Sequence, residues 1–254
     1  MFSRYCLRCL MSVWLTGLGV AVSANQQTND LVFIGEARDI GGGGLLYTET
    51  HRVERDEAGE YLYSRVRYAY PDGTLIAEKT LDFAPSLLMP ALQFEDVRTG
   101  HQIQTRWVDH GSEPSVRLIE QAAGEKRIDS LSVFSDQPSV IDAGFDRLVE
   151  KNWSRLIQGD RIAFDFLALT RGKFVGLVMF VRESDSDSVR IRIEVDNWFF
   201  RMLVDPIELE YSRESRRLQS FTGLTNIERV EAGEPSGENY RARIEYRYEG
   251  QVTP

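Results

Sequence analysis

The sequence predicts a mainly β protein, a large curved antiparallel sheet that forms a half-open β-barrel, with one principal α-helix packed in the concavity. Three observations support this fold class. Apolar and polar residues alternate over most of the chain, which is typical of strands with one solvent-facing side. Turn sequences separate these stretches at short intervals, as a meander of hairpins requires. A single segment, residues 145–157, follows a helical period instead.

The first 24 residues have the features of a secretory signal peptide. Arg4 and Arg8 give a basic start, residues 9–22 form an apolar run, and a small-residue pattern ends at Ala24. We therefore expect residues 1–24 to be cleaved and residues 25–254 to form a single β-rich domain, secreted into the periplasm of a Gram-negative cell. The alternative is an uncleaved membrane anchor, which would need about 18 apolar residues, more than this run contains.

Composition narrows the classes of partner and cofactor. Both cysteines, Cys6 and Cys9, lie in the predicted signal peptide, so the mature chain would have no thiol, disulfide or cysteine-bound metal. The chain has 30 Lys and Arg against 39 Asp and Glu, and cleavage after Ala24 leaves 28 against 39, a net charge of −11. This excess repels the phosphates of nucleic acid, which we exclude as a partner.

The strands of the N-terminal half are separated by glycine and proline turns. Four glycines at positions 41–44 predict a hairpin tip between strands at residues 34–39 and 45–53. Pro71-Asp72-Gly73 divides a strand at 61–70 from one at 74–83. A further strand is expected at 102–108.

The helical segment has an apolar stripe at three- and four-residue steps. The stripe consists of Phe145, Leu148, Val149, Trp153, Leu156 and Ile157. Asp142 is a plausible N-cap and Gly159 a plausible stop. We expect one continuous helix whose stripe packs against the strands that follow it.

Those strands include the most apolar one in the chain. Residues 161–170 precede residues 173–182, and the second segment is apolar on both faces, which predicts a central strand that is covered on both sides. Alternation predicts further strands at residues 189–195, 207–211 and 240–249. Polar segments at 183–188 and 231–238 are expected to be loops. The total is roughly nine to eleven strands.

Catalytic and metal-binding motifs are missing from the sequence. It contains three histidines, His51, His101 and His110, no Gly-x-Ser-x-Gly and no His-Glu-x-x-His. Asp165 lies in an apolar strand, where it needs solvent or a partner such as Arg161 or Lys173. We therefore expect no catalytic residue, no metal and no cofactor.

Apolar residues in two expected connections indicate a ligand cavity. Residues 198–203 and 87–92 are dense in aromatic or aliphatic side chains, and such clusters in loops are typical of a binding mouth or a partner surface. A buried turn that plugs one end of the barrel is the structural alternative. The candidate ligand-binding residues are Phe145, Trp153, Phe164, Phe166, Trp198, Phe199, Phe200, Leu88 and Met89.

The order of elements over residues 31–248 resembles that of the half-barrel lipoprotein-localisation carriers of Gram-negative bacteria. The closing pattern, Leu-Gln-Ser-Phe-Thr-Gly-Leu-Thr-Asn-Ile at 218–227 and Tyr-Arg-Ala-Arg-Ile-Glu-Tyr at 240–246, resembles the ending of secreted proteobacterial proteins of unknown function. The resemblance to the carriers implies that the concavity holds an acyl chain or another apolar ligand, without catalysis. It assigns no ligand-contacting residue.

The sequence thus predicts a non-catalytic periplasmic binding or carrier protein for a lipid-like or other apolar ligand. One alternative is a ligand-free module that binds another envelope protein through its apolar loops. The other is a hydrolase that uses two facing carboxylates.

Overall fold

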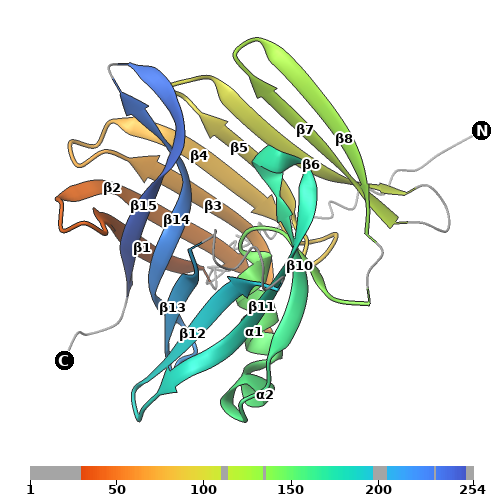
Figure 1. Ribbon diagram of the computed structural model, residues 1–254, viewed down its shortest axis with the longest axis vertical. Helices are drawn as coiled ribbons and strands as arrows, with labels where there is room; N and C mark the ends of the chain where they lie inside the picture. Colours follow the sequence, from red (N-terminus) through yellow and green to blue (C-terminus); the bar gives the residue numbers. More distant parts are fainter. Residues whose placement is uncertain (1–29, 110–113, 134–135, 197–204, 232, 250–254) are drawn as a thin grey trace, which may run out of the picture.

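The computed structural model describes residues 30–109, 114–133, 136–196, 205–231 and 233–249, and the predicted signal peptide lies outside these ranges. Within them, fifteen strands form one curved sheet and two short helices lie on its concave side (Figure 1). The strands are β1 (Leu31–Asp39), β2 (Leu45–Arg55), β3 (Tyr61–Ala69), β4 (Leu75–Asp82), β5 (Ala91–Asp96), β6 (His101–Asp109), β7 (Pro114–Ala122), β8 (Glu125–Ser132), β9 (Ser139–Val140), β10 (Ile162–Ala168), β11 (Lys173–Ser184), β12 (Ser188–Val195), β13 (Ile207–Ser212), β14 (Leu218–Glu231) and β15 (Glu234–Tyr248). The helices are α1 (Gly144–Lys151) and α2 (Trp153–Ile157), and η1 (Leu169–Arg171) is one 3-10 turn. The predicted fold class is confirmed, whereas the assignment of residues 25–254 to a single domain stays a prediction.

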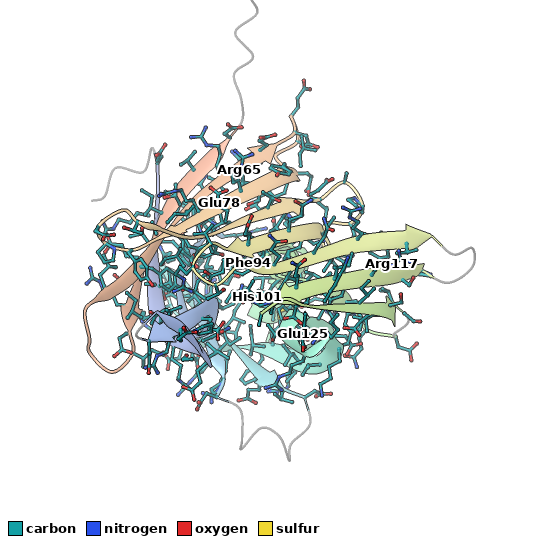
Figure 2. The ribbon with its side chains drawn as sticks, turned by 90° about the horizontal axis from the view of Figure 1, so that it is seen from above. Arg65, Glu78, Phe94, His101, Arg117 and Glu125 are labelled. Atoms are coloured by element: carbon teal, nitrogen blue, oxygen red, sulfur yellow. The ribbon has the colours of Figure 1, made fainter. Side chains whose placement is uncertain are left out.

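Strands that follow each other in sequence also pair in the sheet. Pairing is antiparallel from β8 back to β1 and from β15 back to β10, and β1 pairs with β15, so the first and last strands meet in the middle. The short β9 joins β10 in parallel and forms one edge, while β8 forms the other. Seen from above, Arg65, Glu78, Phe94, Arg117 and Glu125 mark the succession of β3, β4, β5, β7 and β8 along the sheet (Figure 2).

The two ends of the sheet overlap rather than pair. Side chains alternate along a strand, so Leu167 on β10 points away from the face that carries Phe164. Phe164 belongs to the core cluster around the helices, but the fully buried Leu167 belongs to a second cluster, against which Trp107 of β6 and Leu131 of β8 pack. The β6–β8 end of the sheet therefore covers the outer face of β10, and the barrel is an open spiral.

Arg127 of β8 holds this overlap together. Its guanidinium donates hydrogen bonds to the carbonyl oxygens of Leu169 (2.9 Å) and Thr170 (3.0 Å), just beyond the end of β10. Ion pairs with Glu120 (2.8 Å) and Asp129 (2.9 Å) fix the same guanidinium on its own side. One side chain thus bridges the two ends where no backbone ladder joins them.

The predicted helix is present but interrupted. It breaks at Asn152, whose backbone N–H and side-chain amide both donate to the carbonyl oxygen of Leu148. The predicted stop at Gly159 is confirmed, with φ +96 and a hydrogen bond to the carbonyl of Leu156. The predicted N-cap is wrong: Ala143 occupies that position, and Asp142 precedes it with a left-handed φ of +46.

Several strand predictions need correction. The described residues form fifteen strands rather than nine to eleven, and β5, for example, begins at Ala91 inside an expected connection. The loop expected at 231–238 consists mostly of strand, since β14 ends at Glu231 and β15 starts at Glu234. The apolar β11 is third from an edge rather than central, although it is covered on both faces by the overlap and the helices. The expected hairpin tip at 41–44 is confirmed, and the one expected at 183–188 is present but shorter, because β11 runs to Ser184 and β12 begins at Ser188.

Candidate functional site

The concave interior contains two adjacent cavities beside α1. We call one the arginine chamber, about 220 Å³, lined among others by Tyr61, Arg147, Arg216 and Arg217. The other, the aromatic chamber, is about 260 Å³. They share six wall residues: His51, Lys79, Ala143, Asp146, Leu218 and Tyr246. Each chamber alone is somewhat smaller than the usual range of small-molecule sites, about 300–1,000 Å³, and the shared wall residues place the two side by side.

The apolar wall of the aromatic chamber comes from α1, β10 and the strands facing them. Phe164 and Phe166 lie on one face of β10 because they are two residues apart. Phe145, in the first turn of α1, meets Phe164 with ring centroids 5.6 Å apart. The rest of this wall is aliphatic or aromatic as well, including Leu177, Ile193, Ile207, Leu209, Phe221 and Ile244.

A buried ion pair forms the opposite wall. Lys79 Nζ lies 2.7 and 2.9 Å from the two carboxylate oxygens of Asp142, and their side chains are 8% and 6% exposed. Asn226 and the backbone N–H of Ala143 also donate to Asp142. Burial alone would lower the pKa of Lys79, but Asp142 and the Tyr68 hydroxyl more than offset it, so this pKa is raised. Lys79 therefore stays charged inside the barrel.

Glu49 and His51 form a second polar pair on β2. Their side chains lie on the inner face with the buried Tyr47, and His51 Nε2 is 2.9 Å from Glu49 Oε2. The Tyr246 hydroxyl donates to the same carboxylate oxygen at 3.3 Å, and burial raises the pKa of Tyr246 well above its ordinary value. Phe33 stacks on the His51 ring at 4.2 Å between centroids. These contacts hold the imidazole at the boundary between the chambers.

Asp146 is the third buried carboxyl group. It faces inward from α1 and accepts a 2.7 Å hydrogen bond from the Tyr211 hydroxyl. Burial raises the pKa of Asp146 because it disfavours the charged form, and burial with the neighbouring carboxyl also raises the pKa of Tyr211. Asp146 lines both chambers, and Tyr211 lines the arginine chamber.

Basic side chains gather around the arginine chamber. Arg147 pairs with Glu60 at 2.8 Å and Glu150 at 2.5 Å, and its guanidinium lies 4.7 Å from the Tyr61 ring centroid. Burial raises the pKa of Tyr61 to about 12. Arg216 and Arg217 reach the chamber from the hairpin between β13 and β14. This end of the barrel carries α1 and α2 at the bottom of Figure 1.

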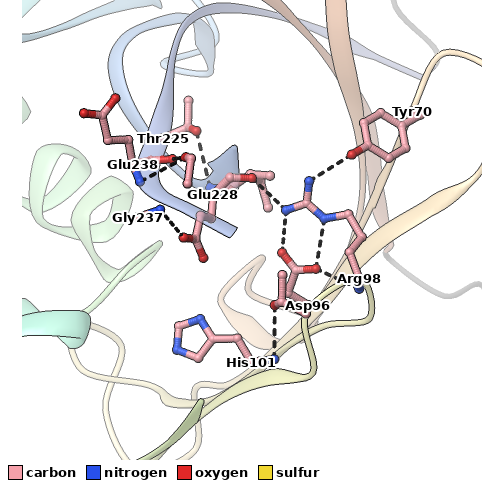
Figure 3. A network of polar contacts seen from close by, with 11 residues as sticks. Tyr70, Asp96, Arg98, His101, Thr225, Glu228, Gly237 and Glu238 are labelled. Carbon is pink, nitrogen blue, oxygen red and sulfur yellow. Dashed lines mark hydrogen bonds and ion pairs between the residues drawn. The ribbon is translucent and has the colours of Figure 1, made fainter. Parts of the chain in front are cut away.

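Arg98 secures the opposite end of the barrel (Figure 3). Its guanidinium makes a two-pronged ion pair with Asp96, at 3.0 and 2.5 Å, and donates to the Tyr70 hydroxyl at 3.0 Å. A 2.7 Å hydrogen bond to the carbonyl oxygen of Glu228 reaches across to β14. The β5–β6 turn is thereby tied to the far wall of the barrel, away from the arginine chamber.

A third hollow, about 390 Å³, lies on the outer face of β4–β8. Glutamine and charged side chains line most of it, including Gln93, Gln104 and Glu95. Because bound ligands are usually enclosed by mainly apolar walls, the interior chambers fit a ligand site better.

The structure brings together some of the residues that the sequence singled out. Phe145, Phe164 and Phe166 line the aromatic chamber. Trp153 packs edge-on against Tyr211 in the core, at 6.1 Å between centroids. Leu88 packs against the helix cluster and Met89 is buried in the other core cluster. Trp198, Phe199 and Phe200 lie outside the described residues.

The polar residues of the chamber walls were not predicted from the sequence. Lys79 follows Ala77 and precedes Leu81 on the buried face of β4, and a charged residue at an apolar position of an alternating strand is the signal that was available. In the same way, His51 is a polar residue on the inward-facing side of β2. Asp165, by contrast, faces away from the chambers beside Gly176, and no ion pair to it is seen in the described part of the chain.

In the described ranges, no three histidine, cysteine or acidic residues come together as a metal site. None of the helices in those ranges is long and apolar enough to span a bilayer.

Fold and site together define an open, overlapping β-barrel with a two-chamber interior. No protein-family model matches the chain, and no curated protein matches it. Among solved structures, it is similar to the crystal structure of a β-barrel-like protein of domain of unknown function DUF1849 from Brucella abortus. The identity is 7%, the TM-score is 0.43, and the alignment covers 86% of this chain and 94% of that chain. Such a distant similarity transfers no residue, ligand or activity, and the resemblance to the lipoprotein-localisation carriers stays a prediction.

Proposed function

We propose that the protein is a non-catalytic binding or carrier protein that holds a lipid-like or other apolar small molecule inside the barrel. The observation that carries the proposal is the pair of adjacent chambers beside α1, one of them walled by Phe145, Phe164, Phe166 and aliphatic side chains. A mostly apolar enclosure with a few placed polar groups is typical of small-molecule sites.

The polar wall of the aromatic chamber supports ligand binding rather than acid–base catalysis. Three carboxyl groups line the aromatic chamber, as a carboxylate-based hydrolase would require. Lys79 engages both oxygens of Asp142, whereas His51 contacts one oxygen of Glu49 and Tyr211 donates to one oxygen of Asp146. Each carboxyl group therefore has a fixed partner within the protein, which favours a structural and orienting role.

A ligand-free interaction module is the competing proposal. Its apolar loop at 198–203 lies outside the described residues, and in the other connection Met89 is buried in the core. The described part of the chain thus offers more support for an interior ligand than for a docking surface.

Export belongs to the same proposal. The predicted signal peptide would deliver the protein to the periplasm, where a soluble container for apolar molecules is useful because they partition poorly into water. The mass of the protein recovered from the periplasm tests this: it should correspond to a chain that starts at Asn25.

Filling the aromatic chamber tests the ligand site. Leu177 lines that chamber, and we expect Leu177→Trp to reduce binding of an environment-sensitive apolar dye to the delipidated full chain by at least about tenfold, a loss of about 1.4 kcal/mol. Ile193→Phe is a milder second filling variant, in case the tryptophan disturbs folding. Leu62→Trp makes the same change at a side chain that is 48% exposed, and should bind as the wild type does.

Two outcomes of this titration contradict the proposal. One is that wild-type protein binds no dye or lipid. The other is that folded Leu177→Trp and Ile193→Phe bind as tightly as Leu62→Trp does, which would place the bound molecule elsewhere.

A further inference from the structure

The two chambers differ in charge. The whole chain is acidic, with a formal net charge of −9. The wall of the arginine chamber nevertheless contains five basic side chains, Arg55, Lys79, Arg147, Arg216 and Arg217, against two acidic ones, Asp146 and Glu150. The aromatic chamber contains one, Lys79, against three carboxyl groups, Glu49, Asp142 and Asp146. A positive enclosure in a negative protein attracts anions to one defined place.

At the edge of that chamber, the exposed Arg216 and the half-buried Arg217 have no carboxylate partner among the described residues. Lys79 is neutralised by Asp142, and Arg147 by its own ion pairs. The Arg216 guanidinium instead lies 5.7 Å from the Trp153 ring, and that of Arg217 lies 5.0 Å from the Tyr248 ring. Stacking orients a guanidinium and leaves its N–H donors open for an anion.

The backbone at Arg216 is unusual in a way that fits a role for the side chain. Its φ is +55, a left-handed conformation that costs a non-glycine residue about 1 kcal/mol or more. Backbone hydrogen bonds fix the turn, from Arg216 N–H to the Ser212 carbonyl and from Ser212 N–H to the Arg217 carbonyl, both 2.9 Å. Glycine would relieve the strain, yet the hairpin presents an arginine at this position.

We propose that the ligand is an anionic amphiphile whose carboxylate or phosphate head is bound by Arg216 and Arg217 in the arginine chamber while its tail occupies the aromatic chamber. This inference rests on the proposed binding function. Guanidinium groups match carboxylate and phosphate oxygens with paired, charge-assisted hydrogen bonds. The aromatic chamber offers apolar walls to the tail and has no unpaired arginine, so the difference between the two chambers sets the direction in which the ligand lies.

Binding of a matched ligand series to the delipidated full chain tests the head group. Palmitate and a palmitoyl lysophosphatidic acid carry anionic heads and separate a free fatty acid from a phospholipid, while hexadecanol has a similar tail without the charge. We expect Arg216→Gln/Arg217→Gln to weaken binding of the preferred anion by about 10- to 100-fold, the loss expected for charged hydrogen bonds. Hexadecanol binding should not change.

Arg52→Gln/Arg65→Gln is the matched control. These two arginines pair in register on β2 and β3, are exposed on the outer face, and make no ion pair within the described part of the chain. The control removes the same charge from the same protein and should bind every ligand as the wild type does. Arg216→Gly is a second variant: it relieves the backbone strain, so it should weaken anion binding without loss of stability.

The outcomes separate the two proposals. If hexadecanol and the anions bind equally well and Arg216→Gln/Arg217→Gln matches the control, the inference about the head group is wrong and the binding function stands. If a folded arginine variant loses hexadecanol and anions in parallel, the arginines do not recognise charge. If wild-type protein binds none of the three molecules, both proposals fail.

Discussion

Lys79 and Asp142 are both nearly buried, and each is the counterion of the other. An ion pair in this setting contributes little compared with apolar residues of the same shape, but the loss of one partner strands the other. Asp142 also has a left-handed φ, which aspartate and asparagine tolerate better than most residues. The pair therefore fixes the start of α1 against β4 more than it adds net stability.

Lys79→Met should lower the free energy of unfolding by about 3–5 kcal/mol, because it leaves Asp142 charged and buried. Lys79→Met/Asp142→Asn should recover most of that loss, since no unpaired charge remains and asparagine still accepts the Ala143 N–H. Urea unfolding measures both values. Lys173→Met at an exposed position should change stability by no more than about 0.5 kcal/mol. A double variant no more stable than Lys79→Met would contradict this view of the pair.

Asp146 predicts a dependence of stability on pH. Its folded pKa is raised above 3.8 by burial, so the folded state holds this proton more tightly than the unfolded chain does. The resulting stabilisation is complete below the unfolded pKa and is lost as pH rises through the folded pKa. Asp146→Asn keeps the acceptor for Tyr211 and does not titrate. We expect the stability of Asp146→Asn relative to the wild type to increase as the pH rises above the unfolded pKa of about 4; urea unfolding at several pH values that shows a constant difference would refute this.

At the scale of the element, α1 depends on a close approach to the connection before β5. Gly144, the first residue of α1, is buried, and a Cβ there would overlap the backbone carbonyl of Leu88. The same carbonyl accepts the N–H of Ile141 at 2.9 Å, so it cannot easily move. The position of α1, and with it both chambers, depends on this contact.

Gly144→Ala should destabilise the protein by about 1–3 kcal/mol, the usual cost of overpacking, although alanine normally favours helices. Lys151→Ala, an exposed change in the same helix, is the control and should be close to neutral. Thermal unfolding measures both. A stabilised Gly144→Ala variant would show that α1 is free to shift.

The elements that could be predicted are those with a strong local pattern. Strict alternation identified β12 and β15, and a 3.6-residue period identified the helices. The break at Asn152 depends on a side-chain bond to Leu148, which periodicity does not encode. The short β9 pairs with β10 although both helices lie between them in the sequence. A strand of two residues is too short to show an alternating pattern.

At the scale of the whole molecule, the overlap of the sheet ends creates the enclosed interior. The curved, antiparallel architecture followed from the alternation, but the spiral did not, because it depends on contacts such as Leu167 with the β6–β8 end. Part of the aromatic wall was predicted from the sequence, because the alternation that identifies the strands also shows which side chains share a face. The polar wall and the basic chamber combine residues of β2, β4, α1 and the β13–β14 hairpin, and proximity of that kind is set by tertiary structure.

Arg127→Met should loosen this overlap. The variant removes two charge-assisted hydrogen bonds to carbonyls beyond β10, which are worth about 1.5–3 kcal/mol each when intact and less at a partly exposed side chain. Native-state hydrogen exchange should show faster exchange in β7 and β8, with β1 and β15 unchanged. Uniform protection across the sheet would mean that packing alone holds the spiral closed.

Native mass spectrometry of the exported protein, purified without detergent, tests the central claim most directly. The account predicts a mature chain that carries a non-covalent adduct with the mass of an amphiphile, which is released on unfolding and missing from Leu177→Trp. A bare mature chain that also takes up no amphiphile after incubation would contradict the account.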